Sequence, residues 1–144
     1  MKKMNNKGFS LIELIIVIAI MAVLVAIIAP NLTKYLGKSK SQTDKTNLDE
    51  IKKQFKNAIS DAATDEITDV KGTYKVTGSS VTVNSSGSTA AGAGANDFAT
   101  KYVAKALDSD TNTKSKVDNS KKSIEVEVTG DDSAGYTLTA KFVS

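Results

Sequence analysis

The chain has 144 residues, enough for one compact domain of modest core beside an apolar N-terminal segment. It contains no Cys and no His, which excludes disulfides and cysteine metal sites and removes the usual general base and the commonest metal ligand. Lys2, Lys3 and Lys7 precede the apolar segment, so residues 9–144 carry 16 Lys against 16 Asp plus Glu, without any Arg. This neutral surface argues against a nucleic-acid partner, since phosphate binding favours a clustered basic face.

The first predicted element is a helix from Phe9 to Ala29, in which only Ser10 and Glu13 are polar. A helix of that length extends about 31 Å and spans a bilayer core. A cleaved secretory signal is the alternative, but Pro30-Asn31-Leu32 after Ala29 makes a poor cleavage site. Lysines on both sides of the segment leave its orientation open: Lys2, Lys3 and Lys7 before it, and Lys34, Lys38, Lys40 and Lys45 after it.

The stretch "NKGFSLIELIIVIAIMAVLVAIIAP" closely resembles the class III signal of type IV prepilins and related pseudopilins. The resemblance rests on a Lys-rich leader that ends at Gly8, followed by Phe9 and by an acid, Glu13, fifth after the glycine. It implies that residues 1–8 are a leader removed after Gly8 by a prepilin peptidase. It also implies that Phe9 is N-methylated and that the apolar helix stays in the mature protein. An ordinary single-span anchor is the alternative.

The same resemblance implies a structural subunit of a type IV pilus, a homo-oligomeric helical filament that serves adhesion, aggregation or twitching motility. The implied partners are the prepilin peptidase, the pilus assembly machinery and, before assembly, the membrane. The precursor is expected in the membrane and the mature subunit at the cell surface. No cofactor, metal or enzymatic activity is expected. A pseudopilin of a type II secretion or competence system, or a membrane-anchored binding domain, are the alternatives.

Glu13 is the one acid within the apolar helix. A charge at the centre of a membrane helix costs ~2.5–3.5 kcal/mol on insertion scales and less near an end. In a filament core without water, the carboxylate needs a partner. Cleavage after Gly8 creates one, the new ammonium of Phe9, so we expect Glu13 of one copy to pair with Phe9 of its neighbour and to set the assembly register.

Residues 31–70 are predicted to continue the helix as an amphipathic segment. Pro30 removes a backbone donor, which predicts a kink or a locally melted turn, and Gly37 offers a second soft point. Farther on, apolar residues recur at helical spacing and form one stripe: Leu48, Ile51, Phe55, Ile59, Ala62 and Ile67.

Residues 71–144 are predicted to form a globular head. A short hairpin is expected around Gly78-Ser79-Ser80, with Tyr74 and Val76 on one strand and Val81 and Val83 on the other. The Gly/Ser/Ala-rich stretch from Asn84 to Asn96 is typical of a flexible, exposed loop. A short helix, "DFATKYVAKAL", follows, with Asn96 or Asp97 as its cap and with Phe98, Tyr102 and Ala106 on one face.

Two alternating segments at the C-terminus predict antiparallel strands joined by a turn at residues 130–135. Their apolar positions are Ile124, Val126 and Val128 in the first strand and Tyr136, Leu138, Ala140 and Phe142 in the second. Such strands need a cover for their apolar face, and the amphipathic helix can supply it. The predicted fold is therefore α+β, with a long N-terminal helix packed on a small antiparallel sheet. Because the chain has no Cys, its C-terminal part cannot be held by the disulfide that closes many Gram-negative pilins.

Two acidic loops are candidate calcium sites by their sequence. Asp108, Asp110 and Asn112 have the spacing of the first ligands of an EF-hand loop, but Thr113 and Asn119 replace the required Gly and Glu. Asp131 and Asp132 lie in a predicted turn, where acids are common for backbone reasons. Solvated loops are the expectation at both places.

Overall fold

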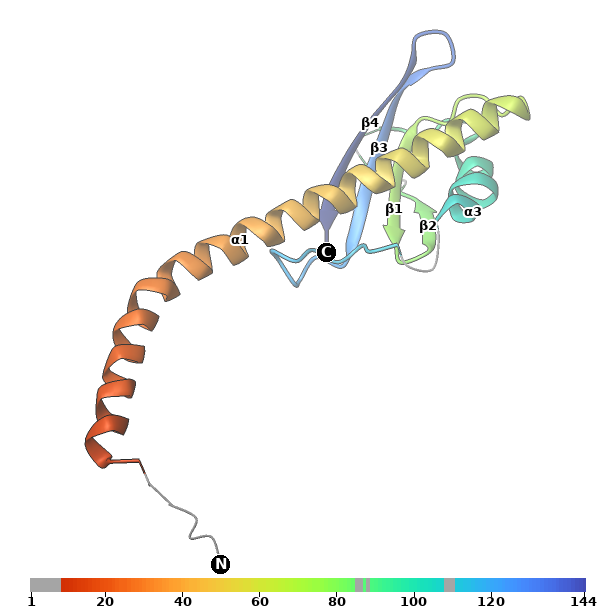
Figure 1. Ribbon diagram of the computed structural model, residues 1–144. Coiled ribbons are helices and arrows are strands. Elements are labelled where there is room, and N and C mark those ends of the chain that lie inside the picture. The colour runs from red at the N-terminus through yellow and green to blue at the C-terminus, as the bar shows by residue number, and fades with distance from the viewer. Residues whose placement is uncertain (1–8, 85–86, 88, 108–110) are drawn as a thin grey trace, which may run out of the picture. The chain divides into compact units, whose positions relative to one another are not determined.

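The computed structural model describes residues 9–84, 87, 89–107 and 111–144, and Figure 1 shows their arrangement. The described chain divides into two units, an N-terminal unit that ends at Ser39 and a head formed by residues 40–144. One helix, α1, contributes to both. In chain order the elements are α1 (Leu11–Thr64), β1 (Gly72–Thr77), β2 (Ser80–Val83), α2 (Ala95–Asp97), η1 (Phe98–Val103), α3 (Ala104–Ala106), β3 (Ser123–Asp131) and β4 (Gly135–Val143).

The sheet of the head is antiparallel, with strand order β2-β1-β3-β4. Both predicted hairpins are confirmed. In the first, Gly78 takes a φ of 60° in the turn, which suits glycine because it lacks a Cβ. In the second, β3 reaches Asp131 and β4 starts at Gly135, so the turn is tighter than the predicted residues 130–135. The predicted α+β fold is therefore confirmed.

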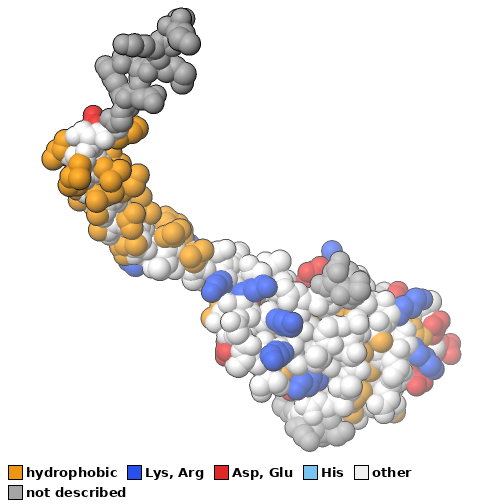
Figure 2. Space-filling model, turned by 90° about the horizontal axis from the view of Figure 1, so that it is seen from below, with side chains coloured by type: hydrophobic (Ala, Val, Ile, Leu, Met, Phe, Trp, Pro, Cys, Tyr) orange, Lys and Arg blue, Asp and Glu red, His pale blue; other side chains and the backbone are white. Residues whose placement is uncertain are grey.

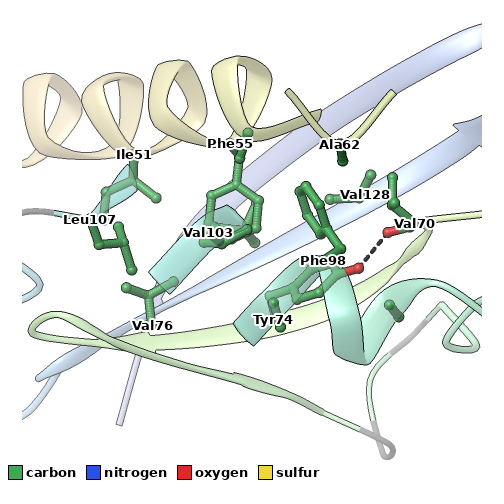
Figure 3. Packing of buried hydrophobic residues seen from close by; sticks show 14 of the residues in the cluster. Ile51, Phe55, Ala62, Val70, Tyr74, Val76, Phe98, Val103, Leu107 and Val128 are labelled. Atoms are coloured by element: carbon green, nitrogen blue, oxygen red, sulfur yellow. Dashed lines mark hydrogen bonds between the residues drawn. The ribbon is translucent and has the colours of Figure 1, made fainter. Parts of the chain in front are cut away.

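The core of the head lies between α1 and one face of the sheet (Figure 3). Of the predicted helical stripe, Ile51, Phe55 and Ala62 are buried, and Ile124, Val126 and Val128 of β3 are buried opposite them. The ring of Phe55 meets those of Tyr74 and Phe98 edge to face, with centroids 5.5 and 6.1 Å apart. Tyr74 is completely buried, and its hydroxyl donates a hydrogen bond to the carbonyl of Val70.

The helix α1 ends at Thr64, although the sequence predicts continuation to residue 70. The amide of Glu66 bonds to the carbonyl of Ala63, and the amide of Ile67 reaches back to that of Ala62. Glu66 takes a φ of 60°, the left-handed conformation that closes such a Schellman motif. The chain therefore leaves the helix through a defined C-terminal cap, and Ile67 packs against the core from outside the helix.

The short helical segment between β2 and β3 differs from its prediction. Its N-cap is Gly94, without a side-chain cap, rather than Asn96 or Asp97. Gly94 fits because a Cβ there would lie 2.2 Å from the carbonyl oxygen of Thr68. The centre of the segment, η1, is π-helical, and the amide of Ala104 bonds to the carbonyl of Ala99, five residues back.

This wider turn changes the face that the segment buries. Phe98, Ala99 and Val103 are fully buried, whereas Tyr102 and Ala106 are only half-buried. The predicted face of Phe98, Tyr102 and Ala106 assumed 3.6 residues per turn. A π-helical turn contains more residues, so Val103 takes the place that Tyr102 was expected to fill.

Two described residues of the loop predicted to be flexible and exposed, Asn84 and Thr89, are hydrogen-bonded to the sheet. The amide of Asn84 donates to the carbonyl of Thr73 at 2.7 Å, and its side chain donates to Glu125 at 3.2 Å. The hydroxyl of Thr89 donates to Glu127. Polar side chains of the loop thus find partners on the sheet, a possibility that the loop's composition does not reveal.

Candidate functional site

The N-terminal unit presents an apolar surface without a cover. Among the described residues of the whole chain, all large apolar side chains that are strongly exposed lie between Phe9 and Leu36, except Val117. The least exposed of them, Ile15, still shows 46% of its surface. Figure 2 shows apolar side chains along the visible face of this segment. The segment is long and apolar enough to cross a membrane, and none of its most apolar window is buried.

Glu13 lies at the start of α1, where it caps the helix. Ser10 precedes the first helical residue, Leu11, and the Glu13 carboxylate accepts a hydrogen bond from the Ser10 amide at 2.8 Å. This is one half of a capping box, in which an acid three residues after the N-cap residue satisfies the amide of that residue. The negative charge also lies at the positive end of the helix dipole. The tetrad Ser-x-x-Glu in "SLIE" is the sequence signature of this cap.

The other predicted site residues of the N-terminal unit are Gly8, Phe9 and Pro30. Gly8 lies outside the described residues. Phe9 is 92% exposed and lies four positions before Glu13. Pro30 lies inside α1, which remains helical through it, and the hydroxyl of Thr33 donates to the Pro30 carbonyl at 3.0 Å. The predicted kink at Pro30 stays a prediction.

A buried carboxylate in the head, which the sequence analysis missed, connects α1 to the loop before β3. Asp44 is only 8% exposed. It accepts hydrogen bonds from the Ser115 hydroxyl at 2.5 Å and from the amides of Lys116 and Val117 at 2.6 and 3.2 Å. Burial acts to raise the pKa of Asp44, but these hydrogen bonds hold it below its ordinary value.

The Asp44 contacts fasten a long loop without a disulfide. Ser115 and Asp44 are 71 positions apart in the sequence, so the contact joins the two ends of a segment that contains β1 and β2. The Ser115 hydroxyl also accepts the amides of Val117 and Asp118 at 3.2 and 2.9 Å. The chain thus fixes this loop with one carboxylate and one hydroxyl.

The acidic loops form no cluster of metal ligands among the described residues. Asp131 accepts the amides of Ser133 and Ala134 at 2.9 and 2.7 Å, which shapes the β3–β4 turn. Asp132 accepts the Tyr136 hydroxyl at 2.6 Å. Asn112 accepts the amide of Lys114, whereas Asp108 and Asp110 lie outside the described residues. Asp131 therefore serves the backbone of its own turn, whereas Asp132 binds the Tyr136 side chain.

Comparison with known proteins identifies the N-terminal segment. A family model described as "Prokaryotic N-terminal methylation motif" matches residues 3–29. The type IV major pilin protein PilA of Myxococcus xanthus is 52% identical over 44 residues, which cover 31% of this chain and 20% of that protein. The prepilin peptidase-dependent protein A of Clostridium perfringens is 38% identical over 71 residues, 48% of this chain and 51% of the relative. No solved structure matches the chain significantly.

These matches cover about half or less of the curated relatives' own length. A pilin belongs to a structural class of proteins rather than to an enzyme class. The motif at residues 3–29 ends at Ala29, the last residue of the apolar segment, and includes Gly8, Phe9 and Glu13. The chain therefore carries the N-terminal methylation motif of prepilins and is homologous, over part of its length, to type IV pilin-like proteins.

Proposed function

We propose that this protein is a structural subunit of a type IV pilus and that it polymerises through α1 into a surface filament. The observation that carries the proposal is the bare apolar surface from Phe9 to Leu36 with a single carboxylate, Glu13, near its start. A soluble protein rarely exposes so large an apolar surface, which needs lipid or identical helices around it. The similarity to a type IV major pilin supports identical helices as the groups that cover this surface.

Processing at Gly8 belongs to the same proposal. A prepilin peptidase removes residues 1–8, and the new amine of Phe9 is methylated. The precursor rests in the membrane by its apolar helix, and the pilus assembly machinery then transfers it to a filament at the cell surface. The motif match across residues 3–29 supports this sequence of events.

The test uses filaments sheared from cells that express the chain. Electron microscopy should show long, thin filaments, and the intact mass of their subunit should correspond to a chain that begins at Phe9 and carries one methyl group. Short assemblies that remain at the envelope would indicate a pseudopilin instead. A subunit that retains Met1, or one that begins after Ala29, would contradict the proposal.

A further inference from the structure

One end of the head is rich in Lys. It consists of the start of the head's part of α1 and of the loop from Thr111 to Lys122, which Asp44 holds against α1. We call this surface the basic end. Its described residues include six Lys against Asp118 and the buried Asp44, whereas Asp108 and Asp110, which precede the loop, lie outside the described residues. The six are Lys40, Lys45, Lys114, Lys116, Lys121 and Lys122.

The Lys side chains of the basic end have few acidic neighbours. Among the ion pairs between described residues, only Lys121–Asp118, at 3.9 Å, belongs to this surface. Five of the six Lys are exposed. Val117, in the middle of the same loop, is 63% exposed, and it is the one large apolar side chain of the described head with such exposure. The loop therefore presents an apolar residue within a positive rim.

The opposite end of the head is acidic. It consists of the last turn of α1, the residues that follow this turn, and the β3–β4 turn. The Asp69 amide connects the two regions by donating a hydrogen bond to Asp132 at 3.4 Å. We call this surface the acidic end. Its six acids are Asp61, Asp65, Glu66, Asp69, Asp131 and Asp132.

Lysines near the acidic end neutralise only part of its charge. Lys71 pairs with Asp69 at 2.9 Å. Lys101 and Lys105 lie with Asp61 and Asp65 around one shallow surface pocket, but Lys101 also pairs with Asp97, at 3.1 Å. Figure 2 shows Lys side chains gathered over one part of the head and a group of acidic side chains, with a few Lys, at its far end.

We propose that the acidic end of one head docks on the basic end of a second copy of this chain, head to tail. The inference rests on the proposed filament, in which all α1 helices run in the same direction. Parallel copies that are displaced along this direction present unlike ends to each other, and a head-to-tail contact of this kind does not close, so it continues as a filament. Opposite potentials on the two surfaces favour this pairing and reject head-to-head contacts, which would bring like charges together.

The length of the helix gives the distance by which two copies in head-to-tail contact are displaced along α1. Lys40 and Asp65 are 25 positions apart on α1 and the turn after it, which corresponds to about 38 Å along the helix. The predicted pairing of Glu13 with a neighbouring Phe9 spans four positions, or about 6 Å. The two contacts therefore join different neighbours. Of the two, only the head-to-tail contact would cover Val117.

Charge reversal tests the contact in the full chain. The basic-end variant carries Lys114→Glu and Lys122→Glu, and the acidic-end variant carries Asp61→Lys and Glu66→Lys. We expect each to lower the yield of sheared filaments about ten-fold, because like charges then face each other across the contact. Combining all four changes should restore the yield. Lys53→Glu with Lys56→Glu makes the same charge change between the two ends, on the head's part of α1, and should leave the yield unaltered.

A cross-link provides a second measurement, because the chain has no Cys of its own. Lys114→Cys and Glu66→Cys in one chain should give a ladder of multimers when filaments are treated with a short bis-maleimide. Lys114→Cys with Lys56→Cys should give a much weaker ladder. Membrane insertion and subunit mass are compared with the parent for every variant.

Three results would overturn the head-to-tail contact while the parent still forms filaments: normal yields for both charge-reversed variants, no restoration in the combined variant, or no ladder. A basic-end variant that loses binding to phosphatidylglycerol vesicles, with filaments that the acidic-end changes do not restore, would assign the basic end to the membrane instead. If the parent chain makes no filaments at all, the proposed function fails and this contact fails with it.

Discussion

Glu13 has one partner within its own chain and, in the proposed filament, a second partner on a neighbouring copy. In the single chain its carboxylate accepts the Ser10 amide and caps α1. In a filament of cleaved subunits it would also face the ammonium of a neighbouring Phe9. A carboxylate has two oxygens and can serve both donors, so the cap can orient the side chain for the contact between copies.

Substitutions at Glu13 separate these roles. We predict that Glu13→Val and Glu13→Gln both insert into the membrane but yield few or no filaments, because both remove the charge. Gln can still accept the Ser10 amide, so it serves as the control for the cap. Subunit mass gives the cleavage state, and shearing gives the filament yield. Normal filaments from a cleaved Glu13→Gln protein would refute the ion pair, whereas an uncleaved protein would assign Glu13 to recognition by the peptidase.

Asp44 predicts a dependence of head stability on pH. Its pKa in the folded head lies below the ordinary value of 3.8, so its stabilising effect is complete above that value and disappears as the pH falls through the folded pKa. We expect Asp44→Asn to lower the free energy of unfolding at pH 7 by about 2–3 kcal/mol, because amide donors lose a charged acceptor.

Denaturant titrations at pH 7 and below pH 4 would measure this effect, with Ser115→Ala as a milder comparison that costs about 1 kcal/mol. The difference in the free energy of unfolding between wild type and Asp44→Asn should become smaller on acidification. Other carboxylates with lowered pKa values, such as Asp118 and Asp131, also contribute to acid sensitivity. A gap that stays constant with pH would show that Asp44 acts through packing alone.

At the scale of elements, the end of α1 carries local strain. Glu66 holds a left-handed φ of 60°, which costs a side chain with a Cβ about 1–2 kcal/mol relative to helical conformations. Glycine adopts this conformation freely and is the usual residue at that position of a Schellman motif.

We therefore predict that Glu66→Gly raises the free energy of unfolding of the head by about 0.5–1 kcal/mol, even though it removes a side chain. Glu66→Ala, which keeps a Cβ, is the matched control and should not stabilise. The midpoint of thermal unfolding is measured for both variants. Equal midpoints for Glu66→Gly and Glu66→Ala would show that the cap is not strained.

At the scale of the whole molecule, exposed apolar surface and core are segregated. The strongly exposed large apolar side chains of the described chain lie before residue 37, apart from Val117, while the buried cluster begins at Ile51. The N-terminal unit therefore depends on lipid or on other copies, whereas the head contains its own core.

This segregation predicts that residues 40–144 fold without the apolar segment. The fragment should be soluble and should unfold in one cooperative transition, because Ile51, Phe55 and Ala62 remain with the sheet that they cover. Phe55→Asp should abolish that transition, since burying an unpaired carboxylate costs several kcal/mol, comparable to the stability of a small domain. Lys53→Asp, on an exposed position nearby, is the control. An unchanged melting temperature for Phe55→Asp would contradict the observed packing of α1.

The sequence alone determined the features that depend on neighbouring residues. The apolar run and the signal at Gly8, Phe9 and Glu13 form one contiguous motif, which a family resemblance identifies. The helical stripe around Phe55 and the alternation around Val126 follow from local periodicity, which secondary structure reflects directly. Only the tertiary structure decided the Gly94 cap, the buried face of η1 and the bond between Asp44 and Ser115. Each of these depends on which distant segment comes close: Thr68 leaves no room for a Cβ at Gly94, and Ser115 meets Asp44 across 71 positions. The separation of Lys and acids between the two ends of the head has the same origin, because overall charge balance does not show where folding places each charge.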